Sequence, residues 1–415
     1  MEVTEITTCR VCQSTSLEEA LSLGDMPLVN SFERSPHAGS PVYPLGITFC
    51  PKCTHVQLTH KCDPKAIFED YIYFSSMSES VVQHGKALAE HYVMNDLALT
   101  HDDDLVVELA SNDGCILKAF QDYPDFCGNV VGIEPAKNIA AFANEQGVPT
   151  VVEFFNSTQA ALLKDFYGPA KLIIARNVVA HVPDVVDFIA GAGHWLADDG
   201  ILHIEVPYLG DMVGNTEFDQ IYHEHLSYFS VTALFHLIHA AGLEMWDVEP
   251  INFHGGSIIV RAKKRINEIT IAGTKLLSRY LLDEQHLNIA SLLNFGNRTR
   301  LRRTQIPELL RSLQKDGKTL AGYGAAAKGV VLTNYCGIGT DLIPYVADIS
   351  PHKQGMWMPG SYIPVLPPEQ LAVVPPDYLV VLAWNFFDEI KRQQQSFCDG
   401  GGKFVLPLPV PRIAV

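Results

Sequence analysis

Residues 106–114 read VVELASNDG, a short apolar run that ends in small, polar and turn-forming residues. Such a run is typical of a buried strand that turns tightly into a helix. The next apolar strand along the chain ends at Glu134. In nucleotide-binding α/β units the loop after the first strand meets the ligand, and an acidic residue ending the second strand binds a ribose hydroxyl. The stretch therefore predicts an α/β unit with a ligand site at its first turn.

A second block of the chain repeats this order. GYGAAAKG at 322–329 is followed by an apolar strand that leads to Asp348, and later strands end at Asn177 in the first block and Asn385 in the second. In both blocks short apolar strands alternate with helical segments, which predicts parallel sheets covered on both faces. We expect two doubly wound units, rather than one unit and an unrelated C-terminal lobe.

Composition divides the chain into three parts. Residues 1–75 are rich in turn formers and thiols, whereas the two alternating blocks occupy 76–265 and 266–415. The last part begins with a helical run from about 269 to 315, whose main interruption is expected at Pro307. A length of 415 residues is enough for about three domains. We expect an α/β protein with a small N-terminal module, a central Rossmann-like domain and a C-terminal Rossmann-like α/β domain with linking helices.

The N-terminal module carries two CxxC pairs, Cys9 with Cys12 and Cys50 with Cys53. Four thiolates close a tetrahedral zinc site, and metal binding supplies folding free energy that so small a module lacks. The odd total of nine cysteines argues against a disulfide framework. The sequence therefore predicts structural zinc, with redox-active or unliganded thiols as alternatives. Other candidate ligands, at less suitable spacings, are Cys62, His55 and His60.

Charge and hydropathy exclude several classes of protein. The 30 Lys and Arg residues face 47 Asp and Glu residues, giving a net charge of −17. No global basic field is therefore available to hold nucleic acid or an anionic membrane. No apolar run is long enough to span a bilayer, and the first residues, MEVTEITTC, do not read as a signal peptide. We expect a cytoplasmic protein with neither nucleic acid nor membrane as a partner.

The loop that closes the first strand also indicates its ligand. A dinucleotide site needs GxGxxG for close approach to a pyrophosphate, but Ala, Ser, Asn and Asp replace most of those glycines here. A ligand with a ribose, an amino-acid tail and no phosphate fits better, which favours S-adenosylmethionine (SAM). An NAD-type unit with a degenerate loop and a domain without ligand are the alternatives. The expected cofactor contacts are Glu108, Ala110, Ser111, Asn112, Gly114, Glu134, Pro135 and Asn177.

Residues 219–225, DQIYHEH, form the densest run of proton-transfer groups in the chain. Tyr222 and His225 would share a face of a helical turn. His181 follows the strand KLIIARN, which places it near the crevice at the carboxyl end of a parallel sheet. Imidazole titrates close to neutral pH and suits general acid or base catalysis. The candidate catalytic residues are His225, Tyr222, Glu224 and His181, although a solvated helix face or a buried histidine pair would explain the same run.

In chain order, the motifs resemble those of the SAM-dependent nucleotide-sugar C-methyltransferases that branch deoxysugars at C3. The matching stretches are CRVC, LGDMPLVNSF, FCPKC, VVELASNDG, GIEPA, NVVAHVPD, EFDQIYHEHLSYFS, HGGS, GYGAAAKG, SPHKQG and LAWNF. The resemblance implies a zinc-binding domain, a SAM domain and a C-terminal domain that helps to hold a nucleotide-diphosphate sugar, in a monomeric enzyme. One position departs from the family pattern: Met77 follows Ser75 and Ser76 where the family usually has a tyrosine.

The resemblance also implies a chemistry. A 4-ketone makes the C3 proton of the sugar removable, and the resulting enolate attacks the methyl group of SAM. We expect His225 to take that proton, Glu224 or Tyr222 to orient it, and His181 or Tyr222 to hydrogen-bond the enolate oxygen. An O- or N-methyltransferase acting on a nucleotide sugar is the runner-up, and a non-catalytic zinc-ribbon scaffold is a further alternative.

The C-terminal block is expected to contact the diphosphate. Its glycines at 322, 324 and 329 permit a tight strand-to-helix turn whose N–H groups face an anion. A dianionic ligand also needs local cations in so acidic a protein. The expected substrate contacts are His254, Arg298, Tyr323, Lys328, Lys353 and Asn385. A plain tight turn would equally explain the HGGS motif that begins at His254, and a solvated helix face would explain Arg298.

Overall fold

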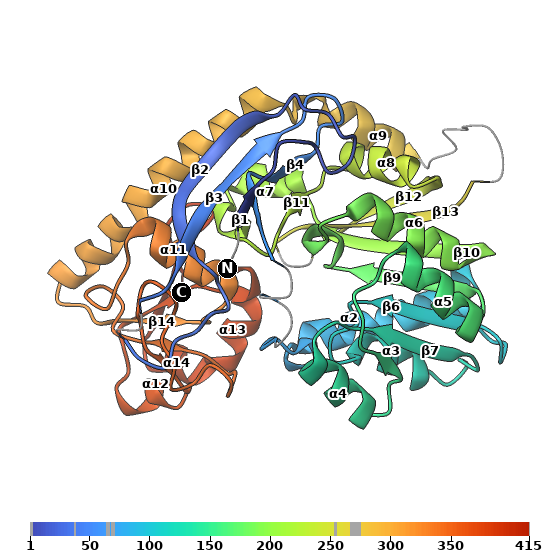
Figure 1. The fold of residues 1–415 in the computed structure, drawn as a ribbon. Coiled ribbons are helices and arrows are strands. Elements are labelled where there is room, and N and C mark those ends of the chain that lie inside the picture. The colour runs from blue at the N-terminus through green and yellow to red at the C-terminus, as the bar shows by residue number, and fades with distance from the viewer. Residues whose placement is uncertain are drawn as a thin grey trace.

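The computed structural model describes residues 3–36, 39–63, 67, 71–252, 255–265 and 275–414 (Figure 1). The stretch 106–114 begins in a strand of a seven-stranded sheet and continues into the loop that follows it. The sheet has the order β12-β13-β10-β9-β6-β7-β8, in which β13 runs antiparallel to both neighbours. The strands are β6 (Leu105–Leu109), β7 (Asn129–Ile133), β8 (Thr150–Val151), β9 (Ala170–Arg176), β10 (Leu196–Pro207), β12 (Leu243–Ile251) and β13 (Ser257–Lys264). The chain order reverses between β6 and β9, and ligands bind at such switch points.

Helices cover both faces of this sheet because its strands are apolar on both sides. Along β6, Val106 packs with one buried cluster, whereas Val107 and Leu109 pack with another. The first cluster takes side chains from α2 (Glu79–His91), α3 (Cys115–Gln121) and α4 (Lys137–Glu145). The second takes them from α5 (Ser157–Tyr167), α6 (Val185–Trp195) and α8 (Val231–Ala240). The predicted sheet with two covered faces is confirmed, and it is parallel except for β13.

The C-terminal unit repeats the plan. Its sheet has the order β16-β15-β14-β17-β18-β19, with only the last of these strands antiparallel. The strands are β14 (Leu320–Tyr323), β15 (Val346–Ala347), β16 (Val365–Leu366), β17 (Tyr378–Val381), β18 (Lys403–Leu406) and β19 (Arg412–Ala414). The helices are α11 (Ala327–Cys336), α12 (Gln370–Val373), α13 (Phe387–Gln393) and α14 (Gln395–Asp399). Its switch point lies between β14 and β17, so the chain contains two doubly wound units.

The N-terminal strands form two further sheets. β1 (Val3–Glu5) pairs with β5 (His60–Cys62), and a four-stranded sheet has the order β11-β4-β3-β2. The four strands are β2 (Glu18–Pro27), β3 (Val42–Phe49), β4 (Val56–Leu58) and β11 (Ser227–Tyr228). The last strand comes from the middle of the chain, directly after the predicted reacting cluster. The N-terminal module is therefore joined to that cluster by strand pairing.

A long helix connects the two α/β units. α10 (Ile289–Lys315) lies beside β2 and β3 in Figure 1, and at Gly296 an added Cβ would stand 3.3 Å from the Ala20 carbonyl oxygen. The expected interruption at Pro307 is wrong, because the helix continues through that residue. The break instead precedes Asn288, the N-cap, after α9 (Lys275–Asp283) and η5 (Glu284–His286). The start of the expected run, 269–274, lies outside the described residues.

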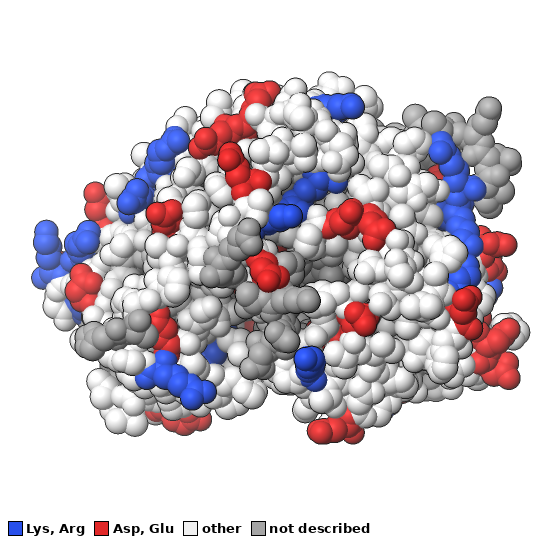
Figure 2. Space-filling model, viewed as in Figure 1, with Lys and Arg blue, Asp and Glu red and all other residues white. Residues whose placement is uncertain are grey.

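Several short elements lie between the strands and the longer helices. They are η1 (Ser75–Met77), η2 (Tyr92–Asp96), η3 (Val179–His181), α7 (Leu209–Asn215), η4 (Phe218–Gln220) and η6 (Trp384–Phe386). Figure 2 shows Lys and Arg scattered among Asp and Glu over the visible face, without one broad basic surface. Within the described ranges, no helix combines the length and apolarity needed to cross a membrane. The predicted division at residues 75 and 265 stays a prediction.

Candidate active site

One cavity of about 690 Å³ is lined from both α/β units. Residues from the loops after β6, β7 and β9 line it from one unit, and residues after β14, β15 and β17 line it from the other. Residues between 220 and 225 also contribute. Its volume lies in the range of about 300–1,000 Å³ that is typical of small-molecule sites. Both switch points therefore open into a single cavity.

Most of the predicted site residues line this cavity. They are Glu108, Ala110, Ser111, Asn112, Glu134, Pro135, Asn177, His181, Tyr222, Glu224, His225, Tyr323, Lys328, Lys353 and Asn385. Among the described residues, Gly114 and Arg298 are not part of the lining, and His254 lies outside the described residues. Met77, at the position that departs from the family pattern, lines the cavity and is 37% exposed.

Gly114 and Arg298 contribute to local structure: Gly114 begins a helix, and Arg298 binds the end of another. Gly114 is the N-cap of α3 with φ +76°, and a Cβ there would lie 2.9 Å from the Val148 side chain. Arg298 Nε donates to Thr216 Oγ1 at 3.0 Å, and its guanidinium also donates to the Val213 carbonyl. These bonds hold the end of α7 against α10. The expected contact between Arg298 and a diphosphate therefore gains no support from the geometry.

The loop after β6 is held open toward the cavity. Ala110 and Asn112 both have positive φ, and the Glu134 carboxylate accepts hydrogen bonds from the N–H groups of Asn112 at 2.9 Å and Ala136 at 2.8 Å. Glu134 therefore fixes the loop. Its carboxylate oxygens have further acceptor capacity for a ribose hydroxyl.

Cavity-lining residues of this unit include four with a side-chain atom that is buried without a hydrogen-bond partner among the described residues: Glu108 Oε2, Ser111 Oγ, Arg176 Nε and Asn177 Oδ1. Burial raises the pKa of Glu108 to about 8. Buried polar atoms are rarely left unsatisfied in native proteins, so each such atom needs a partner. The ribose hydroxyls and amino-acid tail of SAM offer matching groups. The residues present therefore fit SAM.

The reacting cluster is organised around His225. Its Nδ1 lies 2.9 Å from the Gln220 carbonyl oxygen, and its Nε2 lies 2.6 Å from the Tyr222 hydroxyl. Because a carbonyl only accepts, Nδ1 carries the proton and Nε2 accepts from Tyr222. Residues 222–225 form a turn closed by the His225 N–H donating to the Tyr222 carbonyl at 2.9 Å, rather than the expected helical turn. The arrangement leaves His225 with a basic nitrogen on the side of the Tyr222 hydroxyl.

His181 and Glu224 complete the cluster. The His181 and His225 rings meet edge to face, with centroids 4.8 Å apart. Burial lowers the pKa of His181 to about 4, so its imidazole is neutral at physiological pH. The Glu224 carboxylate accepts hydrogen bonds from Asn30 Nδ2 at 2.7 Å and the Tyr71 hydroxyl at 3.2 Å, and burial raises its pKa to about 7. With a pKa of about 7, Glu224 can accept, hold and return a proton near neutral pH, whereas His181 stays neutral there.

Sequence reasoning did not select Asn30, Tyr71 or Arg176, although all three line the cavity. Asn30 lies inside the motif LGDMPLVNSF, so membership of a matching stretch was a usable signal. Arg176 ends β9 one residue before Asn177, and the rule that ligands bind at strand ends could have found it. Tyr71 lies close in sequence to Met77, the position that lacks the family tyrosine, but its contact with Glu224 spans a separation of 153 residues.

The C-terminal unit repeats the loop arrangement of the first. Asp348 accepts from the Ala325 N–H at 2.6 Å, as Glu134 does from Asn112. Lys353 Nζ donates to the Ala325 carbonyl at 2.9 Å and is buried. Lys328 Nζ lies 5.2 Å from the centre of the Trp384 ring. Two cations therefore line this side of a cavity in a strongly acidic protein.

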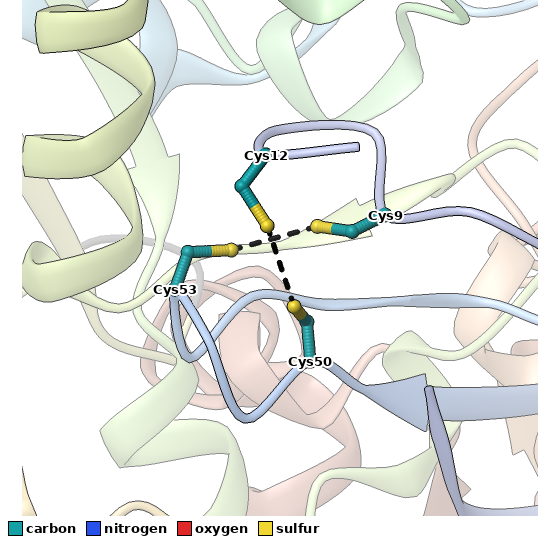
Figure 3. A group of neighbouring side chains, drawn as sticks. All are labelled: Cys9, Cys12, Cys50 and Cys53. Atoms are coloured by element: carbon teal, nitrogen blue, oxygen red, sulfur yellow. Dashed lines mark hydrogen bonds between the residues drawn. The ribbon is translucent and has the colours of Figure 1, made fainter. Parts of the chain in front are cut away.

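The four predicted zinc ligands converge, as Figure 3 shows. The sulfur atoms of Cys9, Cys12, Cys50 and Cys53 all lie within 4.8 Å of one another, and the pairs Cys9–Cys53 and Cys12–Cys50 are each 3.5 Å apart. Tetrahedral zinc with Zn–S bonds of about 2.3 Å separates its sulfurs by about 3.8 Å. A hydrogen bond from Cys53 lowers the pKa of Cys9 to about 5, which favours a thiolate. Both the geometry and the ligand chemistry fit zinc.

Comparisons with known families cover the whole arrangement. Residues 9–68 match a family described as "Putative zinc binding domain", residues 83–248 match "Methyltransferase domain", and residues 252–409 match "C-methyltransferase C-terminal domain". The chain is similar to C-methyltransferase NovU of Streptomyces niveus, with 37% identity over 416 aligned positions that cover 99% of this chain and 97% of NovU.

Two similar solved structures each cover less than half of the chain. A SAM-dependent methyltransferase from Clostridium acetobutylicum is 13% identical with a TM-score of 0.34, covering 43% of this chain and 90% of its own. The methyltransferase CcbJ from Streptomyces caelestis is 14% identical with the same TM-score of 0.34, covering 43% and 89%. The relationship therefore rests on the full-length similarity and the domain matches. The chain belongs to the family of SAM-dependent C-methyltransferases that combine a zinc-binding domain with a C-methyltransferase C-terminal domain.

Proposed function

We propose that the protein methylates C3 of a nucleotide-linked 4-keto-deoxysugar through an enolate that His225 generates. The single observation that carries the proposal is the hydrogen-bond pattern of this imidazole. The Gln220 carbonyl holds the proton on Nδ1, which makes Nε2 the basic nitrogen of a ring that lines the cavity. A sugar carbon needs such a base before it can attack a methyl group, whereas a hydroxyl or amine does not need one as strong.

The neighbouring groups have distinct tasks in this reaction. The Tyr222 hydroxyl, 2.6 Å from His225 Nε2, orients the base and can relay the C3 proton to it. His181, with its neutral imidazole beside His225, is the donor for the developing enolate oxygen. Glu224 receives or returns a proton, since its pKa of about 7 makes both protonation states accessible. SAM supplies an electrophilic sulfonium methyl group when it is bound.

The two units divide the binding. The loop after β6, with Glu108, Glu134 and Asn177, would hold SAM. Tyr323, Lys328, Lys353 and Asn385 of the C-terminal unit would hold the nucleotide diphosphate. Because both sets line one cavity, the sugar would lie between them, beside residues 222–225. Alignment of the two reactants supplies a large part of the rate enhancement in reactions of this kind. The proposed enzyme is monomeric and cytoplasmic.

The test is substitution of His225 with asparagine, which keeps a polar side chain and removes the base. With SAM and a panel of nucleotide-linked 4-keto-deoxysugars, the wild type should yield a methylated product whose new carbon is located at C3 by NMR. His225→Asn should lower kcat about 10²- to 10⁴-fold. His239→Asn, on the exposed end of α8, is the matched control and should keep full activity.

Proton abstraction is measured separately from methyl transfer. In D₂O without SAM, the wild type should exchange the C3 proton of the sugar for deuterium, and His225→Asn should not. Methylation of an oxygen or nitrogen without C3 exchange would identify an O- or N-methyltransferase and overturn the proposal. Calorimetry that detects no heat on adding SAM would identify a non-catalytic scaffold instead.

A further inference from the structure

Each CxxC turn of the zinc site contacts a chain segment that carries a cavity histidine. In the first turn, Arg10 lies between Cys9 and Val11 and is buried, with 9% of its surface exposed. Its Nη1 donates to the Pro183 carbonyl at 2.6 Å. Pro183 lies two residues after His181, on the segment that leads from β9 into α6. The first turn is therefore bonded directly to the His181 segment.

The second turn contacts the segment that follows His225. His55, two residues after Cys53, is fully buried and packs against the Phe229 ring with centroids 5.1 Å apart. Its Nε2 lies 3.1 Å from Ser227 Oγ. The strand that begins after it extends this contact, because the Leu58 N–H donates to the Leu226 carbonyl at 3.1 Å. Leu226 directly follows His225, so strand pairing holds the catalytic turn at its C-terminal side.

The two contacts are parts of one hydrogen-bonded assembly. The Arg10 N–H donates to Gln57 Oε1 at 2.8 Å, and Gln57 Nε2 donates to the Thr8 carbonyl at 3.0 Å. Gln57 is also the residue paired with Ser227 between β4 and β11. Each CxxC turn is therefore linked to both segments. The His181 and His225 rings meet edge to face, and a hydrogen bond between His181 and the Glu224 main chain also links the two segments.

The burial of Arg10 indicates that its side chain holds the His181 segment in position. Its Nε and Nη2 are buried and have no hydrogen-bond partner among the described residues. Burial of a charged group that is incompletely paired opposes stability, and an apolar side chain of similar size would pack at lower cost. The guanidinium attracts the Asp184 carboxylate and the Cys9 thiolate, but its hydrogen bond goes to the Pro183 main chain. A buried guanidinium of this kind does not favour folding by itself. Its bond to Pro183 does hold the His181 segment in one place.

We propose that Arg10 and the His55–Ser227 pair are positioning groups that set the His181 imidazole against the His225 imidazole. This role rests on the proposed function, in which His225 removes the sugar proton and His181 binds the enolate oxygen. The zinc-binding module then acts on catalysis through its own side chains, in addition to any stability that the metal confers. Misplacement by about 1 Å can cost about 10²-fold in rate, so small displacements of these rings should be measurable.

The first variant is Arg10→Met, which keeps the stem of the side chain and removes the donors to Pro183. Lys52→Met is the matched control, because Lys52 is an exposed cation between the two zinc ligands of the second turn. Arg10→Met should keep the zinc content and SAM affinity of the wild type, measured by metal analysis and calorimetry. Its kcat and its C3 exchange rate should fall together by about tenfold to 10²-fold, with the KM for the sugar unchanged.

A second readout does not depend on the reaction. In protein labelled with ¹⁵N-histidine, the imidazole signals of His181 and His225 are assigned with His181→Asn and His225→Asn. Arg10→Met should shift the His181 signals, whereas Lys52→Met should leave them in place. A failure of the proposed function would appear as wild-type protein without C3 exchange, while the NMR shifts would still report the positioning. The two failures are therefore distinguishable.

The outcome that overturns the inference is Arg10→Met with unchanged histidine signals and wild-type kcat. If Arg10→Met loses zinc, Ser227→Ala tests the inference instead. This change is nearly isosteric and removes the hydroxyl facing His55. That variant should keep its zinc and show shifted His225 signals with a reduced kcat. Wild-type signals and kcat in Ser227→Ala would also overturn the inference, because a purely structural contact would change only the stability.

Discussion

Glu224 is a carboxyl group that the fold holds away from water. Only 3% of its surface is exposed, and its two hydrogen bonds come from the neutral donors Asn30 and Tyr71. Burial outweighs these two bonds and the attraction of Lys353, so the pKa rises from 4.5 to about 7. The carboxyl can then change protonation state near neutral pH.

This shift predicts how stability changes with pH. A raised pKa means that the folded protein binds the Glu224 proton more tightly than the unfolded chain does, so its contribution is present below about pH 4.5 and is lost as pH rises through 7. Glu224→Gln removes the titration and keeps the size. The free energy of unfolding of this variant relative to wild type should therefore improve by about 2–3 kcal/mol between about pH 5 and pH 8 in urea titrations.

Glu308→Gln, on an exposed position of α10, is the control and should give no such trend. A Glu224→Gln variant whose relative stability stays constant with pH would show that Glu224 titrates near its ordinary pKa. In activity assays the same variant should lose part of the acidic limb of the pH profile, because the group that changes protonation near pH 7 is gone.

At the scale of single residues, sequence predicted the parts of the site that are local in the chain. Tyr222, Glu224 and His225 stand together in one motif, and His181 follows a recognisable strand. The contacts that complete the site are distant: Asn30 reaches Glu224 across 194 residues, and Arg10 reaches Pro183 across 173. A single sequence contains no signal for such pairs, because they depend on how whole elements pack.

At the scale of elements, α10 shows why the expected helix break was wrong. Proline lacks an N–H and usually interrupts a helix, yet α10 continues through Pro307, which is buried with its neighbour Ile306. Packing of the helix compensates the missing bond. The real boundary is a capping box, in which the Asn288 side chain accepts from the N–H groups of Ala290 and Ser291 at 3.0 and 3.2 Å. A Pro is a conspicuous signal, whereas an Asn–Ser cap is easily overlooked.

The cap predicts that two alanine substitutions in this region change the free energy of unfolding in opposite directions. Asn288→Ala removes both cap bonds and should lower the free energy of unfolding by about 1 kcal/mol. Asn294→Ala, on the exposed side of the same helix, should raise it by a few tenths of a kcal/mol (~0.5 at most), because alanine has the higher helix propensity. Urea titrations of the two variants measure both effects. Equal changes in the two variants would show that the cap does not support α10.

At the scale of the whole molecule, the sequence predicted two α/β units and a zinc site, and the strand orders around both switch points confirm the units. It did not predict how the N-terminal module joins them. The zinc turns pack in one core with the seven-stranded sheet, whereas β2 and β3 pack in a second core with α10 and the C-terminal sheet. The module therefore connects the two halves of the cavity. Strand periodicity predicts which side chains are buried, but not which element covers them.

This connection makes the zinc site a determinant of global stability. Cys12 is the half-exposed ligand, so Cys12→Ser opens the metal site with the smallest disturbance of packing. Zinc binding supplies folding free energy to a module that takes part in both cores, so its loss should destabilise both units together. Cys12→Ser should bind no zinc and should melt in a single transition about 5 °C or more below wild type in calorimetry.

The exposed Cys127 offers the matched control, Cys127→Ser, which should keep both the metal and the melting temperature. Two separated transitions in Cys12→Ser, with the C-terminal one unchanged, would mean that β2 and β3 hold their place in the second core without metal.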